Sequence, residues 1–367
     1  MAMQALTFGI GVAFLIIGAD LLVRGGSGLA AALRITPVVI GLTVAAFGTG
    51  TPELAVSVNA ALWGKPEIAL GNAVGSNIVN ILLVLGLAGV TTPMLVSRRL
   101  MWRDVPVMIG VSVLVLLLGL EGRIARAGGL LMIGGFVAYT YWSVREGRKG
   151  TAHLPAPRPV KRPDSEAKKS LPAVRCVLLI AVGLCMLAFG ARWVVTAAVA
   201  FARLLKFSEL TIGLVILAPS TSLPEIATTV IAALRKQKEI AIGNIVGSNI
   251  FNILIVLGVA AVMAPRGLIV PPAALRFDIP VMIASATVCL PIFITGREIA
   301  RWEGGLLLFY YAAYLLYLLI GASHHEILPA FSIAMMAFVM PLTVLALLFS
   351  FLGRPKNVAP FKKSDRD

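Results

Sequence analysis

Two widely separated stretches of this chain are nearly the same sequence. Residues 69–87 read ALGNAVGSNIVNILLVLGL and residues 241–259 read AIGNIVGSNIFNILIVLGV, so 14 of 19 positions match at an offset of 172 residues. The same offset carries Pro52-Glu53 onto Pro224-Glu225. A charged side chain in the middle of a membrane costs roughly 2.5–3.5 kcal/mol, so a glutamate at matching positions of two apolar segments indicates a functional site. The pattern predicts two structural repeats with a polar site at their junction.

The composition places these repeats in a lipid bilayer. Of the 367 residues, 59% are hydrophobic and 13% are charged, and the mean hydropathy is +0.93. A soluble domain carries about 25% charged residues. The net charge of +15 does not indicate a nucleic-acid partner, because Lys and Arg lie between the apolar segments and in the C-terminal tail. We therefore expect an all-α polytopic membrane protein.

Eleven apolar segments approach or exceed the roughly 20 residues that a membrane helix needs. They lie near 5–23, 37–62, 67–90, 105–120, 126–144, 174–199, 209–234, 239–263, 278–295, 303–321 and 329–352. The repeat offset maps the first five onto the next five, which predicts a ten-helix core and an extra eleventh helix. The expected organisation is a first repeat over 1–144, a linker over 145–173, a second repeat over 174–321, the extra helix over 329–352 and a basic tail over 353–367.

The distribution of Lys and Arg predicts the orientation. With the N-terminus outside, 24 of these residues lie in cytoplasmic segments and seven in external ones, which fits the positive-inside rule and places the tail in the cytoplasm. Five spans are an odd number, so the second repeat enters the membrane inverted relative to the first. We expect the multi-pass inner membrane of a prokaryote. The Pro-rich, basic linker is expected to be disordered, with binding to anionic lipid as the alternative.

The first repeated motif predicts a broken membrane helix. Residues 47–53 read FGTGTPE, and their glycines and proline interrupt a helix, with Thr51 expected as the N-cap of the second half. Residues 219–225 read PSTSLPE and break the equivalent helix with two prolines. A simple proline kink is the alternative, but it does not explain a carboxylate directly after Pro52 and Pro224. The freed carbonyl groups are expected to face a cation.

The second motif supplies polar side chains on one helix face. Asn72, Ser76 and Asn80 recur at every fourth position, and Asn244, Ser248 and Asn252 repeat the pattern. For Asn72 and Asn244, holding helices together is as good an interpretation as binding an ion. For Asn80 and Asn252, which lie deeper in apolar sequence, ligation is the better one.

These motifs together predict a hard, all-oxygen cation site with a formal charge of −2. Calcium accepts six to eight oxygen ligands, whereas magnesium holds its water too firmly for such a cage. Soft metals prefer Cys or His, and neither residue lies near the motifs. Sodium also accepts oxygen ligands. Two facing carboxylates repel each other, so protons or monovalent ions are expected to replace calcium, which is the basis of exchange.

At these residues the chain resembles the calcium/cation antiporter superfamily, specifically the sodium/calcium exchanger membrane domain. The segments 41–87 and 213–259 are similar to that family's paired alpha-repeats. The resemblance implies that the second, third, seventh and eighth helices form the ion site, while the first and sixth slide across them. It also implies calcium and sodium as substrates, no cofactor, and a ligand set that comprises Glu53, Glu225, Thr49, Thr221, Ser222, Ser76, Ser248, Asn80, Asn252 and the backbone carbonyls of Ala46 and Ala218.

Two positions depart from the family pattern. Gly50 stands where many members carry a serine, and Asn252 stands where some carry an aspartate. Both leave sodium coupling open, with calcium/proton exchange or transport of another cation as the alternatives. An enzyme is not expected, because the sequence lacks an H-E-x-x-H zinc motif and a pair of membrane-embedded aspartates. A channel fits broken, inverted repeats less well than an antiporter does, and no protein partner is indicated.

Overall fold

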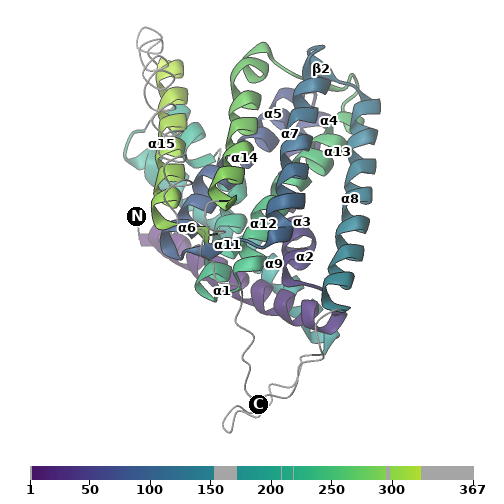
Figure 1. Ribbon diagram of the computed structural model, residues 1–367. Coiled ribbons are helices and arrows are strands. Elements are labelled where there is room, and N and C mark those ends of the chain that lie inside the picture. The colour runs from purple at the N-terminus through teal and green to yellow at the C-terminus, as the bar shows by residue number, and fades with distance from the viewer. Residues whose placement is uncertain (1, 153–171, 208, 218, 295–297, 324–367) are drawn as a thin grey trace, which may run out of the picture.

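The structure of the protein is a computed structural model, and it describes residues 2–152, 172–207, 209–217, 219–294 and 298–323. Among these residues, eight continuous helices are long and apolar enough to cross a membrane, and a bent pair over 37–62 makes a ninth. Figure 1 shows these helices gathered in one bundle. The predicted eleventh span, the tail and residues 153–171 of the linker lie outside the described residues.

The continuous helices are of two kinds. Four are regular: α1 (Ala2–Leu33), α8 (Arg126–Ala152), α9 (Ala173–Leu204) and α15 (Arg301–Ser323). Four contain a π-helical turn: α5–η2–α6 (Pro66–Val79, Asn80–Leu85, Gly86–Thr91), η3–α7 (Leu100–Asp104, Val105–Gly119), α12–η6–α13 (Lys238–Phe251, Asn252–Leu257, Gly258–Met263) and η7–α14 (Ala274–Asp278, Ile279–Ile294). Nine of the predicted spans are confirmed among the described residues, the bent pair over 37–62 included. Helix α8 continues to Ala152, so the linker was predicted to begin too early.

The two Pro-Glu motifs break their helices as predicted. The first is divided into α2 (Pro37–Ile40), η1 (Gly41–Ala45), α3 (Ala46–Thr49) and α4 (Thr51–Leu62), with a bend of 46° at Gly50. The second comprises α10 (Glu209–Ile212), η4 (Gly213–Leu217), η5 (Ser220–Ser222) and α11 (Leu223–Leu234). The prediction of Thr51 as N-cap was wrong: Gly50 occupies that position, and the Thr51 hydroxyl donates back to the Phe47 carbonyl at 2.8 Å.

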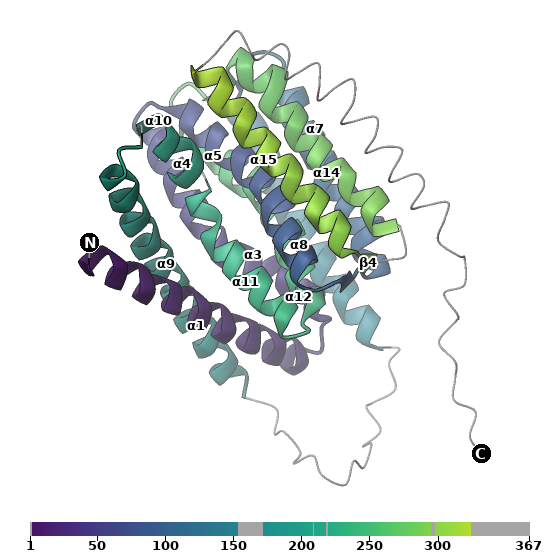
Figure 2. The same ribbon diagram turned by 90° about the vertical axis from the view of Figure 1, so that its left-hand side faces the viewer.

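Contacts between α1 and α9 show that the repeats are inverted. The offset of 172 equates Gly11 with Gly183 and Gly18 with Gly190. In space the pairs are exchanged: a Cβ on Gly11 would lie 3.0 Å from the Gly190 carbonyl oxygen, and one on Gly18 would lie 2.8 Å from that of Gly183. Equivalent helices therefore run antiparallel around an approximate two-fold axis. Figure 2 shows α1 and α9 side by side along one flank of the bundle.

Two short antiparallel strand pairs obey the same symmetry, although the sequence did not predict them. β1 (Met94–Leu95) pairs with β4 (Glu298–Ile299), and β2 (Arg123–Ile124) pairs with β3 (Leu268–Ile269). Each pair joins one repeat to the other. They tie the connections of the two halves together at the ends of the bundle.

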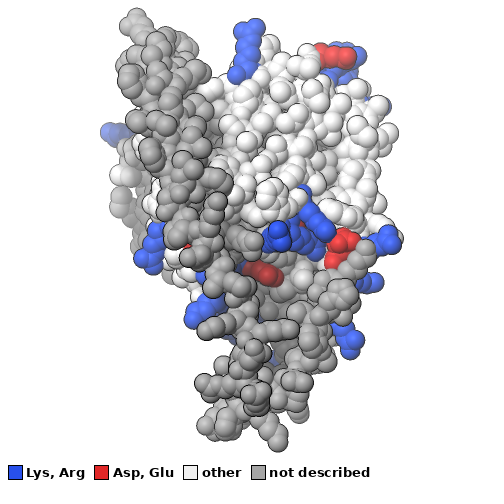
Figure 3. Space-filling model, viewed as in Figure 1, with Lys and Arg blue, Asp and Glu red and all other residues white. Residues whose placement is uncertain are grey.

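The helices that carry the second motif form the centre of the bundle. In their most apolar windows, 78% of the residues of α5–η2–α6 and 83% of those of α12–η6–α13 are buried, against 33% for α1 and 28% for α9. The outer helices therefore present apolar side chains outward, as a bilayer requires. Figure 3 shows one face of the molecule, seen as in Figure 1, with a broad uncharged band and with Lys and Arg side chains gathered along the lower edge of that band.

Candidate cation site

Glu53 and Glu225 lie in the first turns of α4 and α11, and both are fully buried. Pro52 and Pro224 occupy the second positions of these helices, where a missing N–H is harmless and the ring favours helix initiation. The carboxylates therefore sit at helix N-termini, whose positive dipole ends stabilise negative charge. They also lie close enough for mutual repulsion. The structure thus brings the two predicted glutamates together from opposite repeats.

Threonine and asparagine side chains connect the repeats crosswise around the glutamates. The Thr49 hydroxyl donates to Oδ1 of Asn244 at 3.4 Å, and the Thr221 hydroxyl donates to Oδ1 of Asn72 at 3.4 Å. The Asn244 amide donates in turn to Thr229 Oγ1 at 3.2 Å. Asn72 donates to Ser57 Oγ at 3.0 Å and to the Glu53 carbonyl at 3.1 Å. Asn72 and Asn244 therefore serve as a scaffold that orients the threonines.

Asn80 and Asn252 begin the π-helical turns η2 and η6, a feature that the sequence did not predict. A π-helical turn changes the direction of side chains within a helix and is frequent at functional sites. The η2 turn packs against α11, and the η6 turn packs against α4. Each asparagine is therefore carried on a turn that contacts the glutamate-bearing helix of the opposite repeat. The sequence feature that indicated these two asparagines was the repeat of the Gly-Ser-Asn segment at an offset of 172 residues.

Several buried polar atoms near the glutamates make no hydrogen bond within the part of the chain that the structure describes. They are both carboxylate oxygens of Glu53 and of Glu225, the Asn80 amide, Oδ1 of Asn252, and the hydroxyls of Ser222 and Ser248. A buried polar atom without a partner costs roughly 1–3 kcal/mol. Ser76 and Thr221 share a hydrogen bond at 3.3 Å. These oxygens form the kind of donor set that a hard cation prefers.

Of the two carbonyl groups predicted as ligands, only that of Ala46 belongs to a described residue. Ala46 is buried, and its carbonyl accepts the Gly50 N–H at 3.0 Å, which leaves the second lone pair of that oxygen. Ala218 lies outside the described residues. The sequence also missed Asn77 and Asn249, which are equivalent by the offset. Asn77 donates to the Asn249 carbonyl at 3.2 Å and accepts from the Asn252 amide at 3.1 Å, and thus fixes the orientation of Asn252.

The two halves of the site are packed differently. A Cβ on Gly247 in α12 would lie 2.6 Å from the Cα of Leu42, so α12 and η1 are in close backbone contact. Around Gly75, the equivalent residue of α5, no described atom lies within 4 Å of the corresponding position. Gly71 is exposed, whereas its equivalent Gly243 is buried. Among the described residues, the site is therefore closed along α12 and open along α5.

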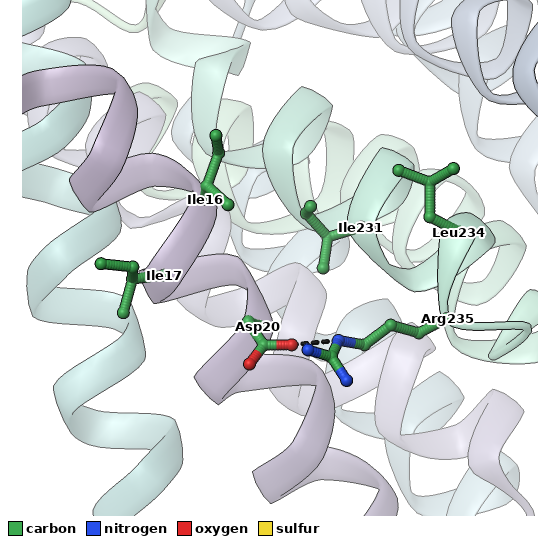
Figure 4. Close-up of a pocket in the computed structure, with 6 residues that line it drawn as sticks. All are labelled: Ile16, Ile17, Asp20, Ile231, Leu234 and Arg235. Carbon is green, nitrogen blue, oxygen red and sulfur yellow. Dashed lines mark ion pairs between the residues drawn. The ribbon is translucent and has the colours of Figure 1, made fainter. Parts of the chain in front are cut away.

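Asp20 joins α1 to α11 away from the glutamates. Its carboxylate forms ion pairs with Arg235 and, at 2.9 Å, with Arg24 of the same helix. Figure 4 shows the Asp20 and Arg235 side chains meeting in an ion pair. Both residues line a cavity of about 380 Å³, together with Ile16, Ile17, Ile231 and Leu234. From the sequence alone, Asp20 is expected to reach the membrane interface or to cap its helix locally, with a role in the sliding of the first and sixth helices as the alternative. The pair with Arg24 is local, and the pair with Arg235 also links an outer helix to the core.

The ion pair across α1 and α11 predicts a small difference in stability between two arginine variants. Arg235→Gln removes an interhelical pair worth about 1 kcal/mol at most at this exposure, whereas Arg24→Gln removes a pair within one helix worth roughly 0.2–0.5 kcal/mol. Thermal unfolding in detergent should therefore show a larger decrease for Arg235→Gln. Equal midpoints for the two variants would contradict a linking role for Arg235.

Comparison with known proteins places this architecture in a family. The model of the family described as "Sodium/calcium exchanger protein" matches residues 3–145 and 176–320. CaxA of Alkalimonas amylolytica is 39% identical over 308 residues, which cover 83% of this chain and 95% of CaxA. The sodium/calcium exchanger MaX1 of Methanosarcina acetivorans is 31% identical over 339 residues, which cover 84% of this chain and 96% of MaX1.

A solved structure shares both the fold and part of the sequence. The sodium-calcium exchanger NCX_Mj superposes with a TM-score of 0.71 at 29% identity, over 84% of this chain and 96% of that one. The inverted helical repeats, the family match over both halves and these relatives agree. This chain therefore belongs to the sodium/calcium exchanger family, and it is a multi-pass membrane antiporter of cations and not an enzyme.

Proposed function

We propose that this protein exchanges calcium for sodium at a site built from both repeats. The observation that carries the proposal is the pair of fully buried glutamates, one from each repeat, among buried oxygens that lack hydrogen-bond partners within the described residues. Calcium accepts six to eight oxygen ligands in adaptable geometry. The proposed ligands are Glu53, Glu225, Thr49, Thr221, Ser222, Ser76, Ser248, Asn80, Asn252 and the carbonyls of Ala46 and Ala218. Sodium as the counter-ion is supported by MaX1 and NCX_Mj, which are named as exchangers of these two ions.

Alternating access is proposed as the route of exchange. The unequal packing of Gly75 and Gly247 supports it, because closing α5 and opening α12 would present the same site to the other side. With the N-terminus outside, as the Lys and Arg distribution predicts, the connection before α5 is external. The structure then corresponds to a state that opens outward in the inner membrane, with the C-terminal tail in the cytoplasm.

A second candidate is calcium/proton exchange. The hydroxyls of Thr221 and Ser222 lie near the Glu53 carboxylate, whereas in the part of the chain that the structure describes Thr49 is the one hydroxyl that acts on Glu225. Fewer oxygens near Glu225 leave a poorer site for sodium, and a carboxylate accepts a proton without further ligands. This observation favours proton coupling over sodium coupling at one of the two glutamates.

Uptake of radioactive calcium into proteoliposomes tests the proposal. Vesicles loaded with sodium and diluted into sodium-free buffer are expected to accumulate calcium, and matched vesicles with only a pH gradient are not. Uptake driven by the pH gradient alone would replace the proposal with calcium/proton exchange. No calcium flux under either gradient would contradict calcium as the substrate.

A further inference from the structure

The two repeats differ at one position beside the site where their backbones agree. Gly50 and Ser222 are equivalent by the offset of 172, and each is the N-cap of the helix that carries a glutamate. Gly50 has φ −80° and ψ 0°, and Ser222 has φ −84° and ψ 6°. Any residue adopts this conformation. The backbone therefore does not require glycine at position 50.

A neighbouring aromatic ring accounts for the glycine. A Cβ on Gly50 would lie 2.7 Å from Cδ1 and 2.9 Å from Cε1 of Phe251. Phe251 is 1% exposed, and its ring is held edge-to-face by Phe47 at 5.3 Å and by Phe136 at 5.7 Å between centroids. A ring fixed on both sides by other rings cannot move aside at low cost. A side chain at position 50 would therefore have to displace the Phe251 ring.

Phe251 is also a point of difference between the repeats. The offset equates it with Val79, a buried residue that ends α5 as Phe251 ends α12. One repeat interface thus combines glycine with phenylalanine, and the other combines serine with valine. The two differences compensate each other in volume, because the ring takes the space that the serine side chain would need.

The exchange of a hydroxyl for a ring changes the chemistry beside the glutamates. The Ser222 hydroxyl is buried, lies near the Glu53 carboxylate and has no hydrogen-bond partner among the described residues. In the other repeat Thr49 contacts Glu225, and the next residue, Gly50, occupies the place equivalent to Ser222 by the offset. There the edge of the Phe251 ring faces Gly50. The edge of an aromatic ring carries partial positive charge and offers no lone pair. A small cation is therefore accommodated poorly there.

We propose that Phe251, seated on Gly50, closes a monovalent-cation subsite beside Glu225 and is a specificity-determining residue of this exchanger. The inference rests on the proposed function, because it concerns the cations that share the site with calcium. The protein then binds sodium beside Glu53, where Ser222 contributes an oxygen, and lacks the equivalent subsite in the other half. Its coupling ratio of sodium to calcium is lower than that of a site with a hydroxyl in both halves.

The inference is tested by placing the equivalents of Ser222 and Val79 at positions 50 and 251. The double variant Gly50→Ser/Phe251→Val reproduces the repeat-two combination, and Gly50→Ala/Phe251→Val is its matched control without the hydroxyl. Equilibrium dialysis of the purified proteins against radioactive sodium counts the bound ions, and the reversal potential of proteoliposomes gives the coupling ratio. The serine variant is expected to bind an additional sodium ion and to couple more sodium to each calcium. The alanine control is expected to match the wild type.

Each other outcome has a defined meaning. Equal sodium binding by the serine and alanine variants would overturn the inference, even with calcium flux intact. Failure of the serine variant to fold, while Phe251→Val folds, would also overturn it, because the removed ring should leave room for serine. Gly50→Ser alone should be less stable than the wild type, and a stable variant that gains sodium would show that the ring does not close the subsite. Loss of calcium flux in every protein, including the wild type, would instead reject the proposed function, while dialysis still reports on the subsite.

Discussion

Glutamine in place of Glu53 or Glu225 is expected to reduce calcium transport to the level of protein-free vesicles. Each substitution keeps the volume of the side chain but halves the formal charge of a site that must desolvate a divalent cation. In the loaded site each carboxylate pairs with the buried cation, and removing one partner of a buried pair of opposite charges costs about 3–5 kcal/mol. That range corresponds to a loss of calcium affinity of more than roughly 100-fold. Calcium uptake into proteoliposomes and calcium binding by calorimetry both measure it.

The repeats supply a matched control for these variants. Glu67 and Glu239 are also related by the offset and lie in the first turns of α5 and α12, but Glu67 is exposed and Glu239 is half-buried. Glu67→Gln and Glu239→Gln should retain transport. Misfolding is distinguished by thermal unfolding in a calcium chelator, where Glu53→Gln should be at least as stable as the wild type because the repulsion between the two carboxylates is gone. Full transport by either Glu53→Gln or Glu225→Gln would reject the site.

A second large effect is expected from alanine at one of two equivalent glycines. Gly247→Ala places a Cβ 2.6 Å from the Cα of Leu42, whereas Gly75→Ala enters space in which no described atom lies within 4 Å. Such overpacking costs about 1–3 kcal/mol, which is enough to change the populations of two conformations by roughly 5- to 150-fold. Gly247→Ala should therefore favour the state that opens along α12, and Gly75→Ala should favour the present one. Both should slow transport, because each penalises one state.

Cysteine labelling measures the direction of this shift. In a background without Cys176, Cys185 and Cys289, Gly71→Cys reports the open face of α5 and Gly243→Cys reports the closed face of α12. Gly247→Ala should increase labelling of the α12 reporter and decrease labelling of the α5 reporter. Gly75→Ala should leave labelling of the α5 reporter high. Identical labelling in both alanine backgrounds would contradict two states related by the packing of these glycines.

Local features of the sequence were sufficient to predict the helices and the central carboxylates. Pro52 and Pro224 each initiate a helix because the proline ring sets φ and removes an N–H, and both effects act within one turn. The fully buried positions of Glu53 and Glu225 followed from their apolar surroundings and from the repeat. The helix ends were less well predicted. Gly50 rather than Thr51 is the N-cap of α4, and α8 extends to Ala152. The position of a helix end therefore depends on contacts outside the local sequence motif.

Other features depend on partners that are distant in the chain. The Asp20 and Arg235 ion pair joins residues of different repeats, and neither sequence context indicates the other. The π-helical turns at Asn80 and Asn252 arise where one central helix packs against the broken helix of the opposite repeat. Propensity does not encode such turns, because they are stabilised by tertiary packing rather than by their own residues.

The sequence by itself determined the membrane class, the two repeats and the pairing of one glutamate from each, since these depend on hydropathy, periodicity and a repeated motif. Only the tertiary structure decided that Gly247 is packed while no described atom lies near Gly75, and that a side chain at Gly50 would meet the Phe251 ring. The physical reason is that nearly identical segments meet different surroundings. A repeated sequence fixes which groups are available, whereas the packing of the opposite repeat fixes which of them face a cation and from which side.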